Sequence, residues 1–195
     1  MKNPKIIPLL IFISFLIVSN GLPAFSFPGY SILSNTTSHL GAQGSPYSWV
    51  MNIIFIGLGI AAIQVTYSTR IRYHQIVGAV FGLSLMSTGL FHHAPLLDSV
   101  PVNQLQDQVH SFFASATGFS FTLLAAGHGF ISTGPQKNAG IIMAFVAIII
   151  SIAMVIFPAI MGLLQRVMFV SAFGWLFFYM ESPRNRQINK KFNFD

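Results

Sequence analysis

Ionisable side chains gather in one short stretch of an otherwise apolar chain. Residues 91–110, FHHAPLLDSVPVNQLQDQVH, hold three of the six histidines and two of the four acidic residues. Imidazole and carboxylate groups are common partners in acid–base catalysis and in zinc binding. The side chains concerned are His92, His93, Asp98, Asp107 and His110. This stretch is therefore the first candidate site.

Two kinds of chemistry fit these residue types. A hydrolase would need a serine nucleophile, Ser34 or Ser38, with His110 as base and Asp98 as the carboxylate that orients it. No nucleophile elbow supports that arrangement. A metal ion would need several of the ionisable side chains, and the candidates are His92, His93, Asp98 and His110. Their spacing matches no standard zinc motif, so we expect neither a metal nor another cofactor.

A simpler interpretation is that these residues cap helices and meet water. Asp107 lies three positions before His110 and is expected to cap the helix that follows. That role explains Asp107, and it extends to His110 as a neighbour in the first turn. It leaves His92 and His93 unexplained, because they follow directly on an apolar segment.

The rest of the chain indicates a membrane protein. It is 53% hydrophobic, with 20 phenylalanines and a mean hydropathy of +0.68. About 20 apolar residues cross the hydrocarbon core of a bilayer as a helix. The predicted spans are 6–25, 49–68, 74–91, 109–131, 139–160 and 162–180. We predict an all-α integral membrane protein, residues 1–195 forming one domain of six helices with a basic cytoplasmic tail at 181–195.

The positions of the basic residues predict which side of the membrane each end of the helices faces. All but Arg166 fall at one side of the predicted bundle, and loops 26–48 and 92–108 contain no Lys or Arg. Positive residues remain on the cytoplasmic side, so both termini are expected there, in the inner (cytoplasmic) membrane. The thin spread of these charges argues against a nucleic-acid partner. The first span could instead be a signal peptide cleaved near Ala24, but the charge alternation argues against it.

Arg166 is the exception to the charge pattern. It lies about one turn inside the last span, where an arginine costs ~2.5–3.5 kcal/mol on insertion scales. It could reach a lipid headgroup as an anchor, pair with Asp98 or Asp107, or clamp an anionic ligand. We expect a ligand-binding role for Arg166.

Other polar residues are expected on the same outer side. Ser38 and His39 belong to a short helix predicted to end at Gly41 or Gly44, and Asn52 lies about one turn inside the second span. Gln165 adjoins Arg166. The predicted ligand-binding set is Arg166, Gln165, Asn52, Ser38, His39, His92 and His93. His74 and His128 fall at the inner ends of their spans, and His128 is interpreted as a satisfied helix-end histidine.

Small residues at helical spacing are expected where helices pack closely. The pairs are Gly57 with Ala61 and Ala114 with Gly118. We interpret both pairs as packing positions without chemistry.

Three motifs resemble a family of six-helix bacterial and archaeal membrane proteins known only as a domain of unknown function. They are SxxxSHLGAxGSPYSWVMN, a histidine that begins the fourth helix after an aspartate-bearing loop, and GLLQR at the start of the last span. The resemblance covers residues 30–179 and implies six spans and no established activity. The chain departs from the expected pattern at FHHAPLLD. A more distant similarity links the layout to the FRAG–DRAM group of lipid-handling proteins.

These observations predict an outward-facing polar pocket that binds an anionic lipid headgroup or a small anion. The expected partners are therefore membrane lipids. Three alternatives stay open: a membrane-embedded lipid hydrolase or transferase that uses a His/Asp pair, a small-solute transporter, and a structural membrane subunit. The sequence leaves open whether the protein is an enzyme and what its oligomeric state is.

Overall fold

The structure is a computed structural model that describes residues 6–180. Within this range the chain forms helices, turns and loops and no strand, so the all-α prediction is confirmed there. The basic tail 181–195 and the first lysines lie outside the described residues. The elements are α1 (Ile6–Gly21), η1 (Leu22–Phe25), α2 (Thr37–Leu40), α3 (Ser48–Ser68), α4 (Arg72–Leu90), α5 (Gln104–Ile131), α6 (Pro135–Ile156), η2 (Pro158–Ile160), α7 (Met161–Gly174) and the π-helix η3 (Trp175–Tyr179).

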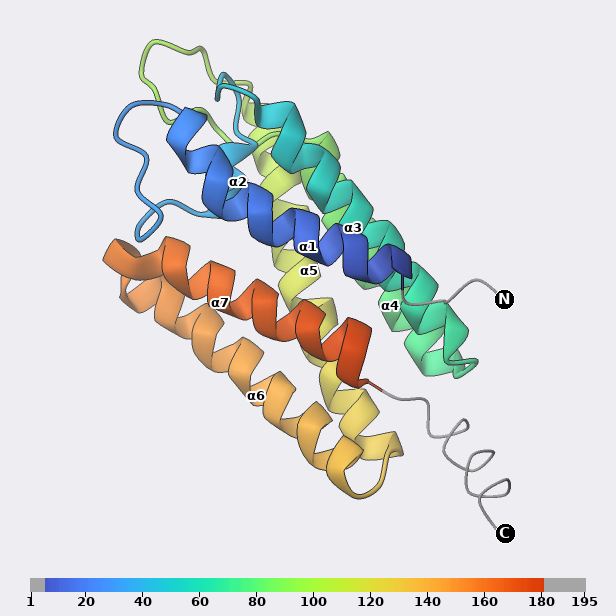
Figure 1. Cartoon of the computed structure of the whole chain (residues 1–195). Coiled ribbons are helices and arrows are strands. Elements are labelled where there is room, and N and C mark those ends of the chain that lie inside the picture. Colours follow the sequence, from blue (N-terminus) through green and yellow to red (C-terminus); the bar gives the residue numbers. More distant parts are fainter. Residues whose placement is uncertain (1–5, 181–195) are drawn as a thin grey trace, which may run out of the picture.

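The long helices form a bundle in which neighbours in the chain are neighbours in space (Figure 1). α3 packs between α1 and α4, and α5 packs between α4 and α6. α7 packs on α6 and also contacts α1, so the first and last long helices are neighbours in the bundle. We call the end that carries residues 26–47, 91–103 and 157–160 the loop end. The other end, with the short connections 69–71 and 132–134, is the turn end.

Aromatic rings fill the interior of the bundle. The ring centroid of Phe173 on α7 lies 6.4 Å from that of Phe15 on α1 and 6.0 Å from that of Phe81 on α4. The outward faces are apolar as well: Val155 is 83% exposed and Phe130 is 79% exposed. Apolar faces of this extent would be unfavourable in water, and a lipid environment explains them.

Within residues 6–180, five segments are long and apolar enough to cross a membrane: 6–25, 48–68, 104–131, 135–156 and 158–179. The sixth predicted span coincides with α4, a helix of 19 residues. α4 begins with Arg72-Tyr73-His74-Gln75, and these polar residues keep it out of the apolar group. Several membrane-spanning helices are thus supported, and a count of six stays a prediction.

Several element boundaries differ from expectation: α6, predicted at 139–160, runs from Pro135 to Ile156. α5 begins at Gln104, well before the predicted 109, and the Asn103 side chain caps it by accepting a hydrogen bond from the Gln106 N–H at 3.2 Å. The prediction that Asp107 caps this helix is therefore wrong. The last span changes period near its end, where α7 continues into a π-helix, a feature that the hydrophobic pattern does not reveal.

Only one of the two small-residue pairs marks tight packing at its glycine. A Cβ added at Gly57 would lie 2.5 Å from Ile11 Cδ1, so this glycine lets α1 approach α3. A Cβ added at Gly118 would meet nothing within 4 Å. The interpretation of Gly118 as a close-contact position is wrong, because the residue faces open space.

Candidate functional site

His110 closes the C-terminal end of α4. Its Nδ1 atom donates to the carbonyl oxygens of Phe91 at 2.8 Å and Thr88 at 3.0 Å. Carbonyls in the last turn of a helix lack partners within the helix, and His110 supplies one. Because a carbonyl oxygen only accepts, Nδ1 carries a hydrogen, and the neutral ring has Nε2 left as its acceptor. The predicted catalytic base is thus buried and held in one orientation.

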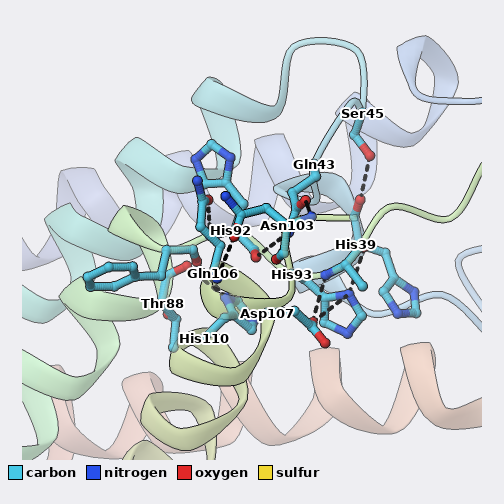
Figure 2. A network of polar contacts seen from close by, with 12 residues as sticks. His39, Gln43, Ser45, Thr88, His92, His93, Asn103, Gln106, Asp107 and His110 are labelled. Atoms are coloured by element: carbon cyan, nitrogen blue, oxygen red, sulfur yellow. Dashed lines mark hydrogen bonds and ion pairs between the residues drawn. The ribbon is translucent and has the colours of Figure 1, made fainter. Parts of the chain in front are cut away.

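A row of three imidazoles lies across the loop end (Figure 2). The ring of His93 packs edge to face against His39 at 5.0 Å and against His110 at 5.5 Å between centroids. Asp107 is the carboxylate next to this row. Its Oδ1 accepts from the Ala94 N–H at 2.7 Å and lies 3.9 Å from His93 Nδ1.

His39 joins this row to the helix α2. Its Nδ1 accepts from the Thr36 N–H at 3.2 Å, which completes a capping box at the start of α2. Burial, together with positive charge on His93, His110 and Arg166, lowers the pKa of His39 to about 4. His39 is therefore neutral at physiological pH and acts as a hydrogen-bond acceptor through Nδ1.

Two of the predicted site residues stand apart from the row. The ring of His92 points away from the other histidines, and Asp98 is exposed on the loop (Figure 2 for His92). The carboxylate beside His93 is Asp107, so the expected pairing of His110 with Asp98 is not formed. Among residues 6–180 no group of three His, Asp or Glu side chains has a geometry that could hold a metal ion.

The candidate nucleophiles Ser34 and Ser38 are not paired with a histidine in the described part of the chain. Neither Ser34 nor Ser38 forms a hydrogen bond with an imidazole there. The hydrolase alternative consequently has no geometric support.

Arg166 is buried and binds the protein's own oxygen atoms. Nε and Nη2 donate to the Ser19 carbonyl at 3.2 and 3.1 Å. Nη2 also donates to the Tyr30 hydroxyl at 2.7 Å. Nη1 reaches three further carbonyls, those of Ile32 at 3.1 Å, Asn35 at 2.9 Å and Gly162 at 3.0 Å.

These bonds join the end of α1, the loop 26–36 and α7 through one guanidinium. The five N–H donors of an arginine are all used in this way. The expected pairing of Arg166 with Asp98 or Asp107 is therefore wrong. Its role in binding a ligand stays a prediction, and the geometry favours a structural role.

Gln165 attaches α2 to α7. Its Oε1 accepts from the backbone N–H and from the hydroxyl of Thr37, both at 2.7 Å. A backbone N–H only donates, so the orientation of the amide is established and its NH₂ group points elsewhere. Asn52 has a related role on α3: its Nδ2 donates to the Gly41 carbonyl at 3.2 Å. A Cβ at Gly41 would lie 2.1 Å from Asn52 Oδ1, which explains the glycine there.

A cavity of about 850 Å³ lies beside these residues, between α5, α6 and α7. α5 and α6 touch toward the turn end, where a Cβ at Gly140 would lie 2.6 Å from Gly129 N. Toward the loop end the lining comes from the facing stretches 114–122 and 147–155. Phe119 and Val155 line it and are 70% and 83% exposed, so the cavity opens sideways between the two helices.

None of the described residues that line the cavity is charged. Most are Phe, Leu, Ile, Val, Met or Ala. The polar ones are Ser38, Thr88, Ser115, Thr117, Thr122, Ser151 and Gln165. Ser38 and Gln165 were predictable as site residues from the sequence. The threonines and Gly118 were not, because small and hydroxyl-bearing residues are equally common where helices pack in lipid.

The apolar helices of the described bundle indicate a polytopic helical membrane protein. The chain matches the family described as protein of unknown function, DUF998, over residues 9–180. It belongs to this family, which confirms the predicted resemblance to a domain of unknown function. Comparisons with the curated proteins and with the solved structures found no match.

Proposed function

We propose that this protein binds a membrane lipid in the cavity between α5, α6 and α7, with the lipid's polar end at Ser38 and Gln165. One observation carries the proposal: the cavity of about 850 Å³ is lined mostly by apolar side chains, and Ser38 and Gln165 are among its few polar lining residues. Pockets of about 300–1,000 Å³ accommodate a small-molecule ligand. The sideways opening supports entry from the bilayer.

The hydrogen-bonding groups at the cavity suggest what the polar end of the lipid is. The hydroxyls of Ser115, Thr117 and Thr122 donate to carbonyls of their own helix. Within residues 6–180, the Ser38 hydroxyl and the Gln165 NH₂ group have no such partner. Both can donate, so they suit an ester, amide or hydroxyl oxygen on the ligand.

The same contacts favour an uncharged headgroup over an anionic one. A charged group in an apolar cavity needs a charge partner, and the cavity lining has none. Arg166, the predicted anion clamp, donates to protein oxygens through all three nitrogens. An anionic lipid would have to displace those bonds, and it is therefore the second candidate.

The test compares how much lipid is retained by two tryptophan variants, one inside the cavity and one outside it. Gly118→Trp fills the cavity, since a side chain there starts into open space. Gly174→Trp is the matched control, because a Cβ at Gly174 also meets nothing within 4 Å and the residue is not part of the lining. Native mass spectrometry of protein in mild detergent, followed by extraction, identifies what each variant retains.

Wild type and Gly174→Trp are expected to retain one diacylglycerol-type or similar uncharged lipid, and Gly118→Trp to lose it. Equal retention by all three proteins would place the lipid elsewhere and refute the proposal. A retained phospholipid that is lost in both Gly118→Trp and Arg166→Met would instead support the anionic headgroup.

A further inference from the structure

Two histidines are fully buried against each other at the turn end, far along the bundle from the cavity mouth. His74 on α4 and His128 on α5 are both 0% exposed, with ring centroids 5.2 Å apart. His128 Nδ1 lies 3.4 Å from His74 Nε2. Ionisable residues are rare at buried positions of membrane helices, and a contacting pair of them calls for a role beyond packing.

At one end of the pair, Thr69 acts as an acceptor. Its hydroxyl donates to the Thr66 carbonyl at 2.8 Å and lies 3.2 Å from His74 Nδ1. A hydroxyl has one hydrogen, and the carbonyl is its closer acceptor. His74 Nδ1 must then carry a hydrogen to bond Thr69, which makes Nε2 the acceptor of a neutral His74.

At the other end, Gln136 is also an acceptor. Its Nε2 donates to the Tyr179 carbonyl at 2.9 Å, so its Oε1 faces His128 Nε2 at 3.2 Å. A carbonyl cannot donate, so this amide orientation holds. His128 Nε2 needs a hydrogen to bond Gln136, and His128 Nδ1 needs another to bond His74.

Two neutral imidazoles carry two hydrogens, and the three contacts described above need three. We propose that His74 and His128 form a binding site for one additional proton, with His128 as the imidazolium and His74 as its neutral Nδ1–H partner. The site lies at the turn end and is independent of the proposed lipid cavity. Trp175 packs on His128, with ring centroids 5.4 Å apart and the rings perpendicular.

When this proton is lost, His128 Nε2 changes its hydrogen-bond partner. Ser132 Oγ lies 3.3 Å from His128 Nε2 and can donate to it once that nitrogen has lost its hydrogen. The Gln136 oxygen then faces a lone pair at 3.2 Å, which is repulsive. Gln136 holds the carbonyl of Tyr179, the last residue of the π-helix, so the proton is coupled to this helix end.

Few other charges face the pair in the described range. Tyr73 packs beside His74, with ring centroids 6.1 Å apart, and its hydroxyl donates to the Leu123 carbonyl. Among residues 6–180, the cations at this end are Arg70, Arg72 and Lys137, all exposed. The hydrogen-bond partners of the protonated pair are Thr69 and Gln136, and no described carboxylate contacts it.

The experiment is ¹⁵N NMR of histidine-labelled wild-type protein in lipid nanodiscs, titrated over roughly pH 5–9. Imidazolium, Nδ1–H and Nε2–H rings have different ¹⁵N shifts. We expect one ring to change from imidazolium to the Nδ1–H form while a second, in the Nδ1–H form throughout, moves with the same midpoint. Two rings with separate midpoints, or rings that stay neutral over the whole range, would overturn the proposal.

Three variants assign the signals and test the partner. Gln136→Leu removes the acceptor and should lower the midpoint by about one pH unit or more, since a hydrogen bond to a charged group is lost. Gln136→Glu places a carboxylate there and should raise the midpoint by about as much. Gln75→Leu is the matched control, because Gln75 lies at the same end and donates to the Tyr67 carbonyl. A midpoint that moves equally in Gln75→Leu and Gln136→Leu would refute the assignment of Gln136.

Discussion

Arg166 shows how a single residue can look like a ligand site and serve the fold. An arginine in a membrane span suggests function because its burial is costly. Here the cost is offset by hydrogen bonds to Ser19, Tyr30 and the loop 26–36. The residue that breaks the charge pattern is therefore the one that ties three separate segments together.

Replacing Arg166 should destabilise the protein even when the charge is kept. Arg166→Lys retains a cation but lacks the planar group of five donors, so several buried carbonyls lose their partner. We expect a loss of about 2–4 kcal/mol, measured as a lower melting temperature in detergent. Arg72→Lys, at an exposed position, should melt as wild type does. An unchanged melting temperature for Arg166→Lys would contradict the structural role.

His39 should make the stability depend on pH. Its pKa falls from the ordinary 6.5 to about 4 through burial and nearby positive charge. The unfolded chain takes up a proton near pH 6.5 and the folded chain only near pH 4, so stability is intact above 6.5 and is lost as the pH falls toward 4. After allowance for partial solvent access, we expect His39 to account for a loss of about 1–3 kcal/mol.

His39→Gln isolates this effect. A glutamine at the third position of α2 can still complete the capping box and does not titrate. The melting temperature of this variant should fall less between pH 7 and pH 4.5 than that of wild type. His92→Gln, whose ring lies outside the histidine row, should retain the wild-type slope. Parallel curves for His39→Gln and wild type would show that His39 does not carry the dependence.

At the scale of elements, the hairpin of α5 and α6 is held at one end and open at the other. Gly129 and Gly140 meet near the turn end, where an added Cβ would meet backbone at 2.6 Å. Gly118, on the same helix as Gly129, faces the cavity. Glycines of equal helix propensity therefore have opposite structural roles along one hairpin.

The two positions should respond differently to alanine. Gly140→Ala forces the helices apart, because its neighbour is backbone that cannot rotate away, and should cost about 1–3 kcal/mol. Gly118→Ala should be neutral or stabilising by up to ~1 kcal/mol, since alanine favours the helix and meets no neighbour. Melting temperatures in one detergent compare the two variants. If both lower the temperature equally, the hairpin is not closed at Gly140.

At the scale of the whole molecule, the open question is whether α4 crosses the bilayer. α4 has the length of a span, and its polar first turn separates it from the five clearly apolar segments. It nevertheless packs between α3 and α5 over its length. Packing against α3 and α5 therefore holds α4 in the bundle, although its polar first turn would be unfavourable in the bilayer alone.

Single cysteines can decide this, because the chain has none. Ser68→Cys and Ser99→Cys place one thiol at each exposed flank of α4. If α4 spans the membrane with the loop end outside, a membrane-impermeant maleimide labels Ser99→Cys in intact cells. Ser68→Cys should then label only after permeabilisation. Labelling of both in intact cells would mean that α4 does not cross.

Hydrophobic runs and polar loops followed from the sequence, because a bilayer imposes length and composition on each helix separately, whereas the ends of α5 and α6 did not. The helices α1, α3, α5 and α6 and the turn at Gly41 were predictable in this way. Local rules failed where two options were close: Asn103 and Asp107 are both good caps, and the choice depended on Asp107 bonding Ala94 across the loop.

Contacts between distant segments were decided only by the tertiary structure. Which oxygens Arg166 meets, whether Gly118 faces a helix or a cavity, and the contact of His74 with His128 all depend on how helices rotate and cross. Sequence spacing reports the faces of one helix and contains no information on the angle to its neighbour. The membrane character of this protein could therefore be predicted from its composition. Its cavity and the contact between His74 and His128 are formed only when the helices pack together.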